Sequence, residues 1–269
     1  MDKVRTTPKT TANRMKSYLE EGKRFDGRTP EQFRELTIEK DVSIKAEGSV
    51  RVRLGKTEVI VGIKMATSEP YADSPTKGNL MVTAELLPLS SPRYESGPPK
   101  IGAIEWARVT DRGIRESGFV DFEKLCIEEG KKVWTVFVDV YSVNDDGNLM
   151  DAATIGAIAA MKIAKVPKYD AEKDKVLYDE LTDEGLPLTD IVPVAVSVHK
   201  LGKTLIVDPT RDEEDVSESR TTIGSSKGVI SSLQKSNSAA LEIEEIKKVF
   251  EISARISEEI LDKIEKAIK

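Results

Sequence analysis

Three arginines could contact phosphate groups if the segment around them is helical. Arg108, Arg112 and Arg115 recur at intervals of four and three residues within the segment 101–117. At 100° per residue they fall within an arc of about 60°, while Trp106 and other apolar residues occupy different sectors. Guanidinium groups can donate paired hydrogen bonds to phosphate oxygens, so this face could follow a nucleic-acid backbone.

The same arginine spacing also fits a face that is only solvated or salt-bridged. Glu105, Asp111 and Glu116 lie on the same predicted helix and could neutralise the arginines. Aromatic residues make up only 5% of the chain, so a base-stacking groove is not predicted. Spacing alone therefore favours the salt-bridged alternative.

An acidic stretch is the second candidate for chemistry. After a predicted strand, residues 208–215 contain Asp208, Asp212, Glu213, Glu214 and Asp215. Paired carboxylates can hold a divalent cation beside a reacting phosphate. An acidic solvated loop explains the stretch equally well, and we assign no metal ligands.

Other candidate residues point to structural roles. Gly224–Gly228 lacks the full spacing of a phosphate-binding loop and predicts a turn. His199 has no evident catalytic partner, so we expect it at a strand end or on the surface. Cys126 is the single cysteine, which excludes an internal disulfide and predicts an ordinary buried thiol.

Composition narrows the class of protein. The 269 residues are 39% hydrophobic and 33% charged, as expected for a globular chain. A net charge of −6 excludes a uniformly basic coat but allows a confined basic patch. The longest uncharged apolar stretch, Ala152–Met161, is about half of a membrane span, and no secretory signal is evident. We therefore expect a cytoplasmic protein without a membrane partner.

Hydrophobic patterns predict the elements that position these residues. Alternating or continuous apolar runs predict strands within 36–67, 80–89, 132–143, 192–199, 205–207 and 229–233. Helical spacing predicts helices at 12–23, 101–117, 152–165 and 241–268. The small residues of Ala152–Met161 indicate a helix packed closely on a sheet. Local strands with few helices indicate an α+β fold.

A short repeat suggests two related halves. Leu54-Gly55-Lys56-Thr57 recurs as Leu201-Gly202-Lys203-Thr204, each time between strand patterns and ahead of a helix. The segment between the two halves carries eight acidic residues in 170–190. The predicted organisation is an N-terminal helical arm (1–29), a first half (30–168), an acidic connector (169–189) and a second half (190–269).

Several segments together resemble the RNase PH family. The clearest motifs are Asp111–Ser117 (DRGIRES), Asn144–Asn148 (NDDGN) and Asp208–Thr210 (DPT), followed by Asp212–Glu214 (DEE). The resemblance runs from about residue 20 to 260 and looks closest to the non-catalytic ring subunit of the archaeal exosome. It implies two similar β-rich halves with packed helices. It also implies a hexameric ring in which this chain alternates with a catalytic paralogue. Such a ring shortens RNA from its 3′ end by phosphate attack.

The phosphate cradle of active family members is altered in this sequence. Active members resemble one another in an Asp-Gly-Gly-Thr-Arg-Thr run, where this chain has the residues 146–151 (DGNLMD). Met150 replaces the arginine, and Asp151 replaces a threonine with a charge that repels phosphate. Two like charges about 4 Å apart cost about 4 kcal/mol at an effective dielectric near 20. We therefore predict no catalytic residues and no cofactor.

The combined prediction is a non-catalytic structural and RNA-binding subunit of an exosome ring. The resemblance implies that Arg112 and Arg115, together with Arg108, contact RNA phosphates across the subunit interface. The implied partners are the catalytic paralogue, RNA and RNA-binding cap proteins. The resemblance also implies a pair of aspartates six positions apart in active members, a spacing at which this chain has Asp208 and Glu214. Two alternatives remain: a divergent active exoribonuclease that uses Asp208 and Glu214, and a scaffold without an RNA role.

Overall fold

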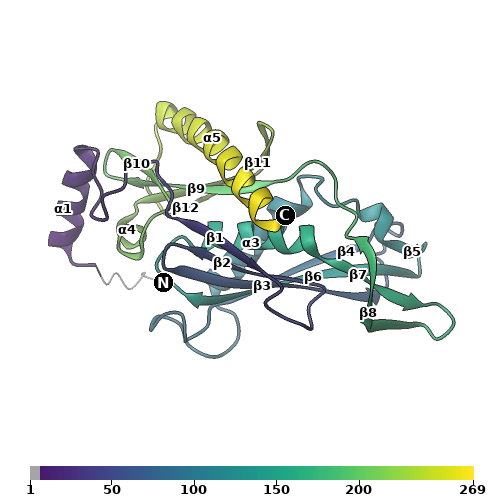
Figure 1. Ribbon diagram of the computed structural model, residues 1–269. Coiled ribbons are helices and arrows are strands. Elements are labelled where there is room, and N and C mark those ends of the chain that lie inside the picture. Colours follow the sequence, from purple (N-terminus) through teal and green to yellow (C-terminus); the bar gives the residue numbers. More distant parts are fainter. Residues whose placement is uncertain (1–6) are drawn as a thin grey trace.

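A computed structural model describes residues 7–269 and contains two separate multi-stranded sheets with helices around them (Figure 1). The first sheet has the order β1-β2-β3-β6-β4, with β5 pairing on β6. Its strands are β1 (Leu36–Lys40), β2 (Gly48–Leu54), β3 (Thr57–Ser68), β4 (Asn79–Glu85), β5 (Cys126–Glu128) and β6 (Lys132–Asn144). All pairs are antiparallel except β4 with β6. In β2 the alternation predicted from sequence is confirmed, because Val50 and Val52 are buried while Arg53 is exposed.

The second sheet is fully antiparallel and has the order β10-β9-β11-β12. Its strands are β9 (Val194–Leu201), β10 (Thr204–Val207), β11 (Ser219–Ser226) and β12 (Val229–Ser236). The repeated Leu-Gly-Lys-Thr motifs form matching hairpin turns, with Leu54 paired to Thr57 and Leu201 paired to Thr204. Gly55 and Gly202 adopt φ values of 58° and 62°, which glycine tolerates best. This match confirms that the same kind of hairpin occurs twice in the chain, once in each sheet.

Five α-helices and one short 3₁₀ helix complete the described part of the chain: α1 (Lys9–Glu20), α2 (Ile101–Arg115), η1 (Phe122–Leu125), α3 (Leu149–Ile163), α4 (Arg211–Val216) and α5 (Ile243–Ile268). Helix α3 lies between the two sheets (Figure 1) and contacts β2, β3 and β9. The small-residue packing predicted for this helix is confirmed, because a Cβ on Gly156 would lie 2.6 Å from Val61 Cγ2. No helix among the described residues combines the length and the apolar character needed to cross a membrane.

The segment predicted as an acidic connector contains regular structure. Strands β7 (Lys165–Asp170) and β8 (Lys175–Gly185) pair as an antiparallel hairpin, so most of 169–189 belongs to this hairpin. The sequence pattern did not predict these strands because β8 is largely exposed and lacks an apolar alternation. The four domain boundaries remain a proposal, and residues 1–6 of the predicted arm lie outside the described residues.

Three smaller predictions have mixed outcomes. His199 is buried within β9 and lies 3.0 Å from the Ser217 hydroxyl, so the surface expectation was wrong. Cys126 is only half-buried at the start of β5, so a fully buried thiol was also wrong. The turn predicted at Gly224–Gly228 is confined to Lys227 and Gly228, which connect β11 with β12.

Candidate functional site

Helix α2 presents its arginines to solvent because its opposite side is fixed in the core. Trp106 and Ile114 are buried, and the Trp106 indole Nε1 donates a 2.9 Å hydrogen bond to the Leu149 carbonyl of α3. Arg108, Arg112 and Arg115 are all exposed. The structure therefore places the three arginines on the outer side of a helix that is anchored to α3.

The three arginines differ in their partners. Arg115 donates to both carboxylate oxygens of Asp111 and to the Leu80 carbonyl, so its charge is neutralised locally. Neither the Arg108 nor the Arg112 side chain forms a hydrogen bond or an ion pair with a residue in the described range 7–269. The salt-bridged alternative therefore fits Arg115, whereas Arg108 and Arg112 keep guanidinium groups that could bind an anion.

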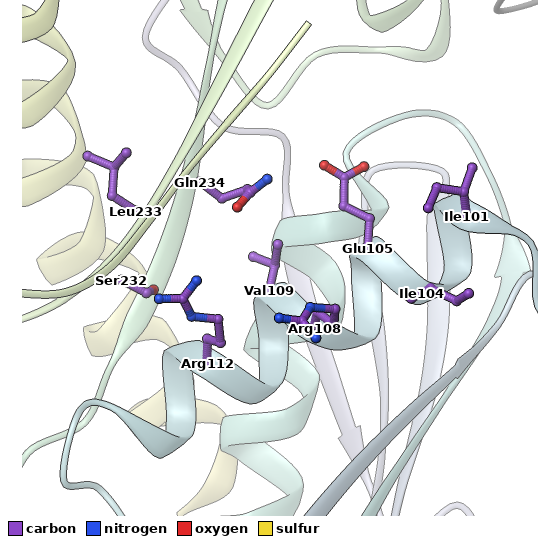
Figure 2. Close-up of a pocket in the computed structure, with 9 residues that line it drawn as sticks. All are labelled: Ile101, Ile104, Glu105, Arg108, Val109, Arg112, Ser232, Leu233 and Gln234. Atoms are coloured by element: carbon purple, nitrogen blue, oxygen red, sulfur yellow. The ribbon is translucent and has the colours of Figure 1, made fainter. Parts of the chain in front are cut away.

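Glu105, a carboxylate on the same helix as these two arginines, already has partners. Glu105 accepts a 2.6 Å hydrogen bond from Arg220 Nη2 and another from the Ser236 hydroxyl. A cavity of about 340 Å³ lies between α2 and β12, and Arg108 and Arg112 line one side of it (Figure 2). The exposed cationic face of α2 thus borders a defined cavity.

The altered cradle lies at the start of α3. Asn148 precedes the helix with a φ of 57°, and α3 begins at Leu149, three residues earlier than predicted. Leu149 and Met150 are buried, and Asp151 is completely buried. None of these three side chains can supply the positive charge that a phosphate site needs.

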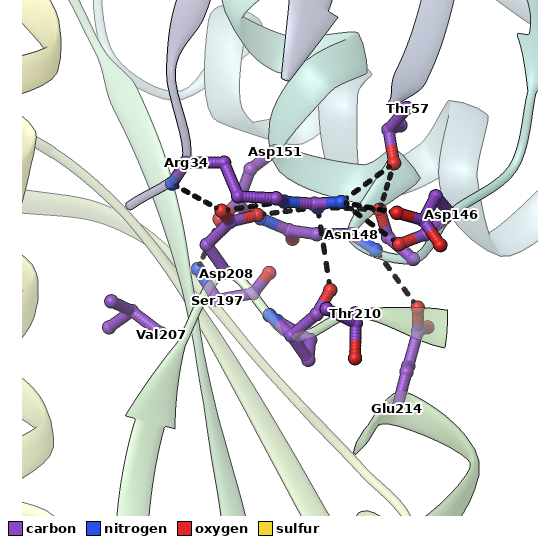
Figure 3. A network of polar contacts seen from close by, with 12 residues as sticks. Arg34, Thr57, Asp146, Asn148, Asp151, Ser197, Val207, Asp208, Thr210 and Glu214 are labelled. Atoms are coloured by element: carbon purple, nitrogen blue, oxygen red, sulfur yellow. Dashed lines mark hydrogen bonds and ion pairs between the residues drawn. The ribbon is translucent and has the colours of Figure 1, made fainter. Parts of the chain in front are cut away.

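Asp208 is held by cationic and amide donors (Figure 3). Its Oδ1 accepts hydrogen bonds from Arg34 Nη2 (2.7 Å) and Asn148 Nδ2 (2.9 Å). Its Oδ2 accepts from the Arg34 backbone N–H (2.7 Å), from Arg34 Nε (2.9 Å) and from Arg28 Nη1 (2.9 Å). The carboxylate is therefore fully buried and saturated with donors, which leaves no free oxygen for a cation.

Glu214 belongs to α4, and its side chain lies at the N-terminal end of α3. Its Oε2 accepts a 3.0 Å hydrogen bond from the backbone N–H of Asn148 and lies 3.4 Å from Arg211 Nη1. Burial alone would raise the pKa of Glu214, but the attraction of Arg211 and the Asn148 hydrogen bond lower it to about 2. A helix N-terminus favours an anion, and here the anion is a side chain of the same protein.

Asp208 and Glu214 therefore do not fit the divalent-cation site that active family members imply. Each carboxylate has its own basic partners, namely Arg28 and Arg34 for Asp208 and Arg211 for Glu214. Within residues 7–269, no three His, Cys, Asp or Glu side chains are arranged as metal ligands.

Asp151 carries the most perturbed carboxyl group of the network. Its Oδ2 accepts from Asn148 Nδ2 (3.0 Å) and from the Ser197 backbone N–H (3.2 Å), whereas its Oδ1 is buried without a partner among the described residues. Burial raises the pKa of Asp151 to about 7, against the lowering effect of these hydrogen bonds. The group is therefore largely protonated below neutral pH.

Sequence reasoning did not identify the arginines that complete this network. Arg34 lies 174 positions from its partner Asp208, and no local pattern links the two. Arg24, which is buried and paired with both oxygens of Glu213, is similarly distant from its partner. The only sequence signal was indirect, since the segment Arg24–Arg28 contributed to the family resemblance.

Comparisons with known proteins match most of the chain. The family model for the 3′ exoribonuclease family, domain 1, matches residues 32–167, and that for domain 2 of the same family matches residues 192–256. The chain is 47% identical to the exosome complex component Rrp42 of Thermococcus onnurineus, with 94% of this chain and 93% of the relative covered. It is 44% identical to the protein of the same name from Methanocella arvoryzae, with 93% of each covered.

Solved structures give the same result. A chain of the Archaeoglobus fulgidus exosome with RNA bound to the active site has a TM-score of 0.86 and 43% identity, covering 94% of this chain and 96% of that chain. A chain of an archaeal exosome core has a TM-score of 0.83 and 40% identity, with the same coverage. Rice Rrp46, at 18% identity and a TM-score of 0.69, shares the fold. The α+β fold in two halves that the sequence predicted is thereby confirmed.

Proposed function

The chain belongs to the 3′ exoribonuclease family, whose fold is that of RNase PH, and on this premise we propose that it is a non-catalytic, RNA-binding subunit of an exosome ring. The ring is hexameric and alternates this chain with a catalytic paralogue that degrades RNA by phosphorolysis. The names of the relatives and the RNA-bound exosome structure support this assignment.

The position of the Glu214 carboxylate at the start of α3 is the observation that carries the non-catalytic part of the proposal. Phosphorolysis requires inorganic phosphate to bind beside another phosphate, so the site must supply a positive charge that is not already neutralised. At the start of α3, Glu214 accepts a hydrogen bond from the Asn148 N–H and forms an ion pair with Arg211. Met150 occupies the position at which active members have arginine. The resident carboxylate would repel an incoming phosphate, and the buried Asp151 offers it no positive charge.

The cationic face of α2 supports the RNA-binding part. Arg108 and Arg112 are exposed and lack a partner among residues 7–269, so they lose no internal contact when they bind RNA. Arg115 already pairs with Asp111, so we assign it a smaller contribution to RNA binding. Phosphate contacts of this kind are independent of base sequence. They would hold the RNA close to the partner's active site.

The remaining parts of the proposal concern the assembly. The ring would carry RNA-binding cap proteins and would act in the cytoplasm. The chain's own contribution is to complete the partner's RNA path and to hold the ring together.

Separate and joint purification test the proposal. The chain alone should release no nucleoside diphosphates from RNA in the presence of phosphate, whereas the ring formed with the catalytic paralogue should release them. Phosphate-dependent release by this chain alone would support the active alternative. RNA crosslinks to the assembled ring should include α2, and crosslinks confined to the paralogue would support the scaffold alternative.

A further inference from the structure

The cavity between α2 and β12 has walls of three chemical kinds (Figure 2). Its volume is about 340 Å³, which lies at the small end of the range for ligand pockets. The apolar wall consists of Ile101, Ile104, Val109 and Leu233, the polar wall of Ser232 and Gln234, and the charged groups are Glu105, Arg108 and Arg112. Apolar walls with a few polar groups are typical of sites for small ligands.

The charge of this cavity is positive although the chain carries −6 overall. Among the described residues 7–269, Glu105 is the single carboxylate that lines it, and that group is paired with Arg220. Arg108 and Arg112 lie one helical turn apart on the same face, so neighbouring phosphates of one strand can reach both. The charged side of the cavity therefore favours an anionic group such as a phosphate.

The polar wall can form hydrogen bonds with a base edge. Ser232 and Gln234 are two residues apart on β12 and so lie on the same face of the strand. Figure 2 shows the Gln234 side chain extending from β12 toward α2. Neither side chain forms a hydrogen bond within the described residues 7–269, and the Gln234 amide offers both a donor and an acceptor.

A larger groove on the other side of α2 is less suited to RNA. It has a volume of about 690 Å³, lies between α2 and β4, and is also lined by Arg108 and Arg112. Three carboxylates line it as well, namely Glu85, Asp111 and Asp139. Among residues 7–269, Glu85 and Asp139 have no ion pair, so this groove is less positive than the cavity between α2 and β12.

We propose that the cavity between α2 and β12 receives one nucleobase of a single-stranded RNA whose phosphates are held by Arg108 and Arg112. The base lies against the apolar wall and its edge meets Gln234 and Ser232. This inference rests on the proposed RNA binding and adds a base-binding subsite to it.

Abasic RNA tests the proposal in the ring formed with the catalytic paralogue. The probes are uridine oligonucleotides in which a single abasic ribose is moved along the strand, and the measurement is equilibrium binding. One abasic position should weaken binding by about tenfold, because it leaves the cavity unfilled while every phosphate is kept. Gln234→Trp fills the cavity and should bind intact RNA about tenfold more weakly, with no sensitivity to that abasic position.

Val229→Trp is the matched control, since Val229 is an exposed apolar residue of the same strand that does not line the cavity. It should behave like the wild type. Gln234→Ala removes the amide without added bulk, so it tests the proposal even if the tryptophan variant fails to fold. It should reduce the loss of affinity that the abasic position causes.

Two results would overturn the inference. The first is equal binding of all abasic probes by the wild type. If Arg112→Ala still lowers the salt dependence of binding in that case, the proposed phosphate contacts stand and only the base subsite fails. The second is a Gln234→Trp chain that folds but no longer assembles into the ring, as judged from the mass of the complex. This result would identify the cavity as a protein interface.

Discussion

The backbone N–H of Asn148 donates a 3.0 Å hydrogen bond to Glu214, which lies 66 positions away in the second half of the chain. This contact joins the start of α3 to α4 across the two halves. It places a negative charge at a helix N-terminus, which is the position that a bound phosphate would favour. The protein therefore supplies its own anion where active family members are expected to bind one.

Removal of the Glu214 carboxylate should create a phosphate site. In Glu214→Ala, the Asn148 N–H and the Arg211 guanidinium lose a shared anionic partner, and an external anion can replace it. We expect inorganic phosphate to bind measurably to this variant by isothermal titration calorimetry and not to the wild type. No phosphorolysis should appear, because Met150 still occupies the arginine position.

Asp212→Ala serves as the control for this substitution. Asp212 is an exposed carboxylate on the same helix, so its removal changes the net charge equally without opening the site. Equal phosphate affinity in the wild type and in Glu214→Ala would show that the carboxylate does not block an anion site.

Asp151 should give the protein a distinctive dependence of stability on pH. Its pKa is raised to about 7, whereas an aspartate of the unfolded chain has its ordinary pKa of 3.8. Between these values the native state retains a proton that the unfolded state has lost, so the free energy of unfolding should fall as pH rises from about 4 to 7. Over this pH range the free energy of unfolding should fall by an amount on the order of a few kcal/mol.

Asp151→Asn should flatten that part of the profile, because the amide stays neutral at every pH. Its carbonyl oxygen can still accept from Asn148 Nδ2 and the Ser197 N–H. Urea unfolding at a series of pH values measures the effect, and Asp262→Asn, on the exposed side of α5, is the control. The same slope in Asp151→Asn and in the wild type would contradict the assignment.

Gly156 should tolerate no larger side chain. A Cβ at this position would lie 2.6 Å from Val61 Cγ2 and 3.3 Å from Val52 Cγ2, so Gly156→Ala forces α3 away from the first sheet. We expect a loss of about 1–3 kcal/mol in the free energy of unfolding, despite the better helix propensity of alanine. Val61→Ala in the same chain should recover part of this loss.

Gly102→Ala is the matched control for this prediction. Gly102 is also helical, but a Cβ added to it would have only Leu86 Cδ1 nearby, at 3.7 Å. This substitution should be neutral or stabilising by up to about 1 kcal/mol. If both glycine variants have the same stability, close packing does not explain the small residues of α3.

The sequence was sufficient to predict elements whose pattern is local. The alternation Val50-Arg51-Val52 and the two Gly-Lys turns depend on neighbouring residues, and they occur as predicted. Strand β11 was missed because Ser219–Ser226 is rich in Ser and Thr and owes its burial to β9 and β12 on either side. Burial that comes from distant strands leaves little signal in a local window.

The candidate site divides in the same way. The shared face of Arg108 and Arg112 follows from helical spacing, which a sequence contains. That Asp111 neutralises Arg115, rather than either of the other two arginines, depends on side-chain conformations. The Arg34–Asp208 contact joins residues 174 positions apart, so only the folded chain brings them together.

The salt dependence of RNA binding should rank the three arginines of α2 in the assembled ring. Each lost contact with a single-strand phosphate lowers the magnitude of the log-affinity against log-salt slope by about 0.7. Arg108→Ala and Arg112→Ala should each show about this change, since both side chains lack a partner within residues 7–269. Arg115→Ala should change the slope less, because Asp111 already neutralises that guanidinium. Arg255→Ala, an exposed arginine of α5 paired with Glu259, should leave the slope unchanged. Binding of one single-stranded RNA across a salt series measures all four, and equal slopes throughout would remove α2 from the RNA path.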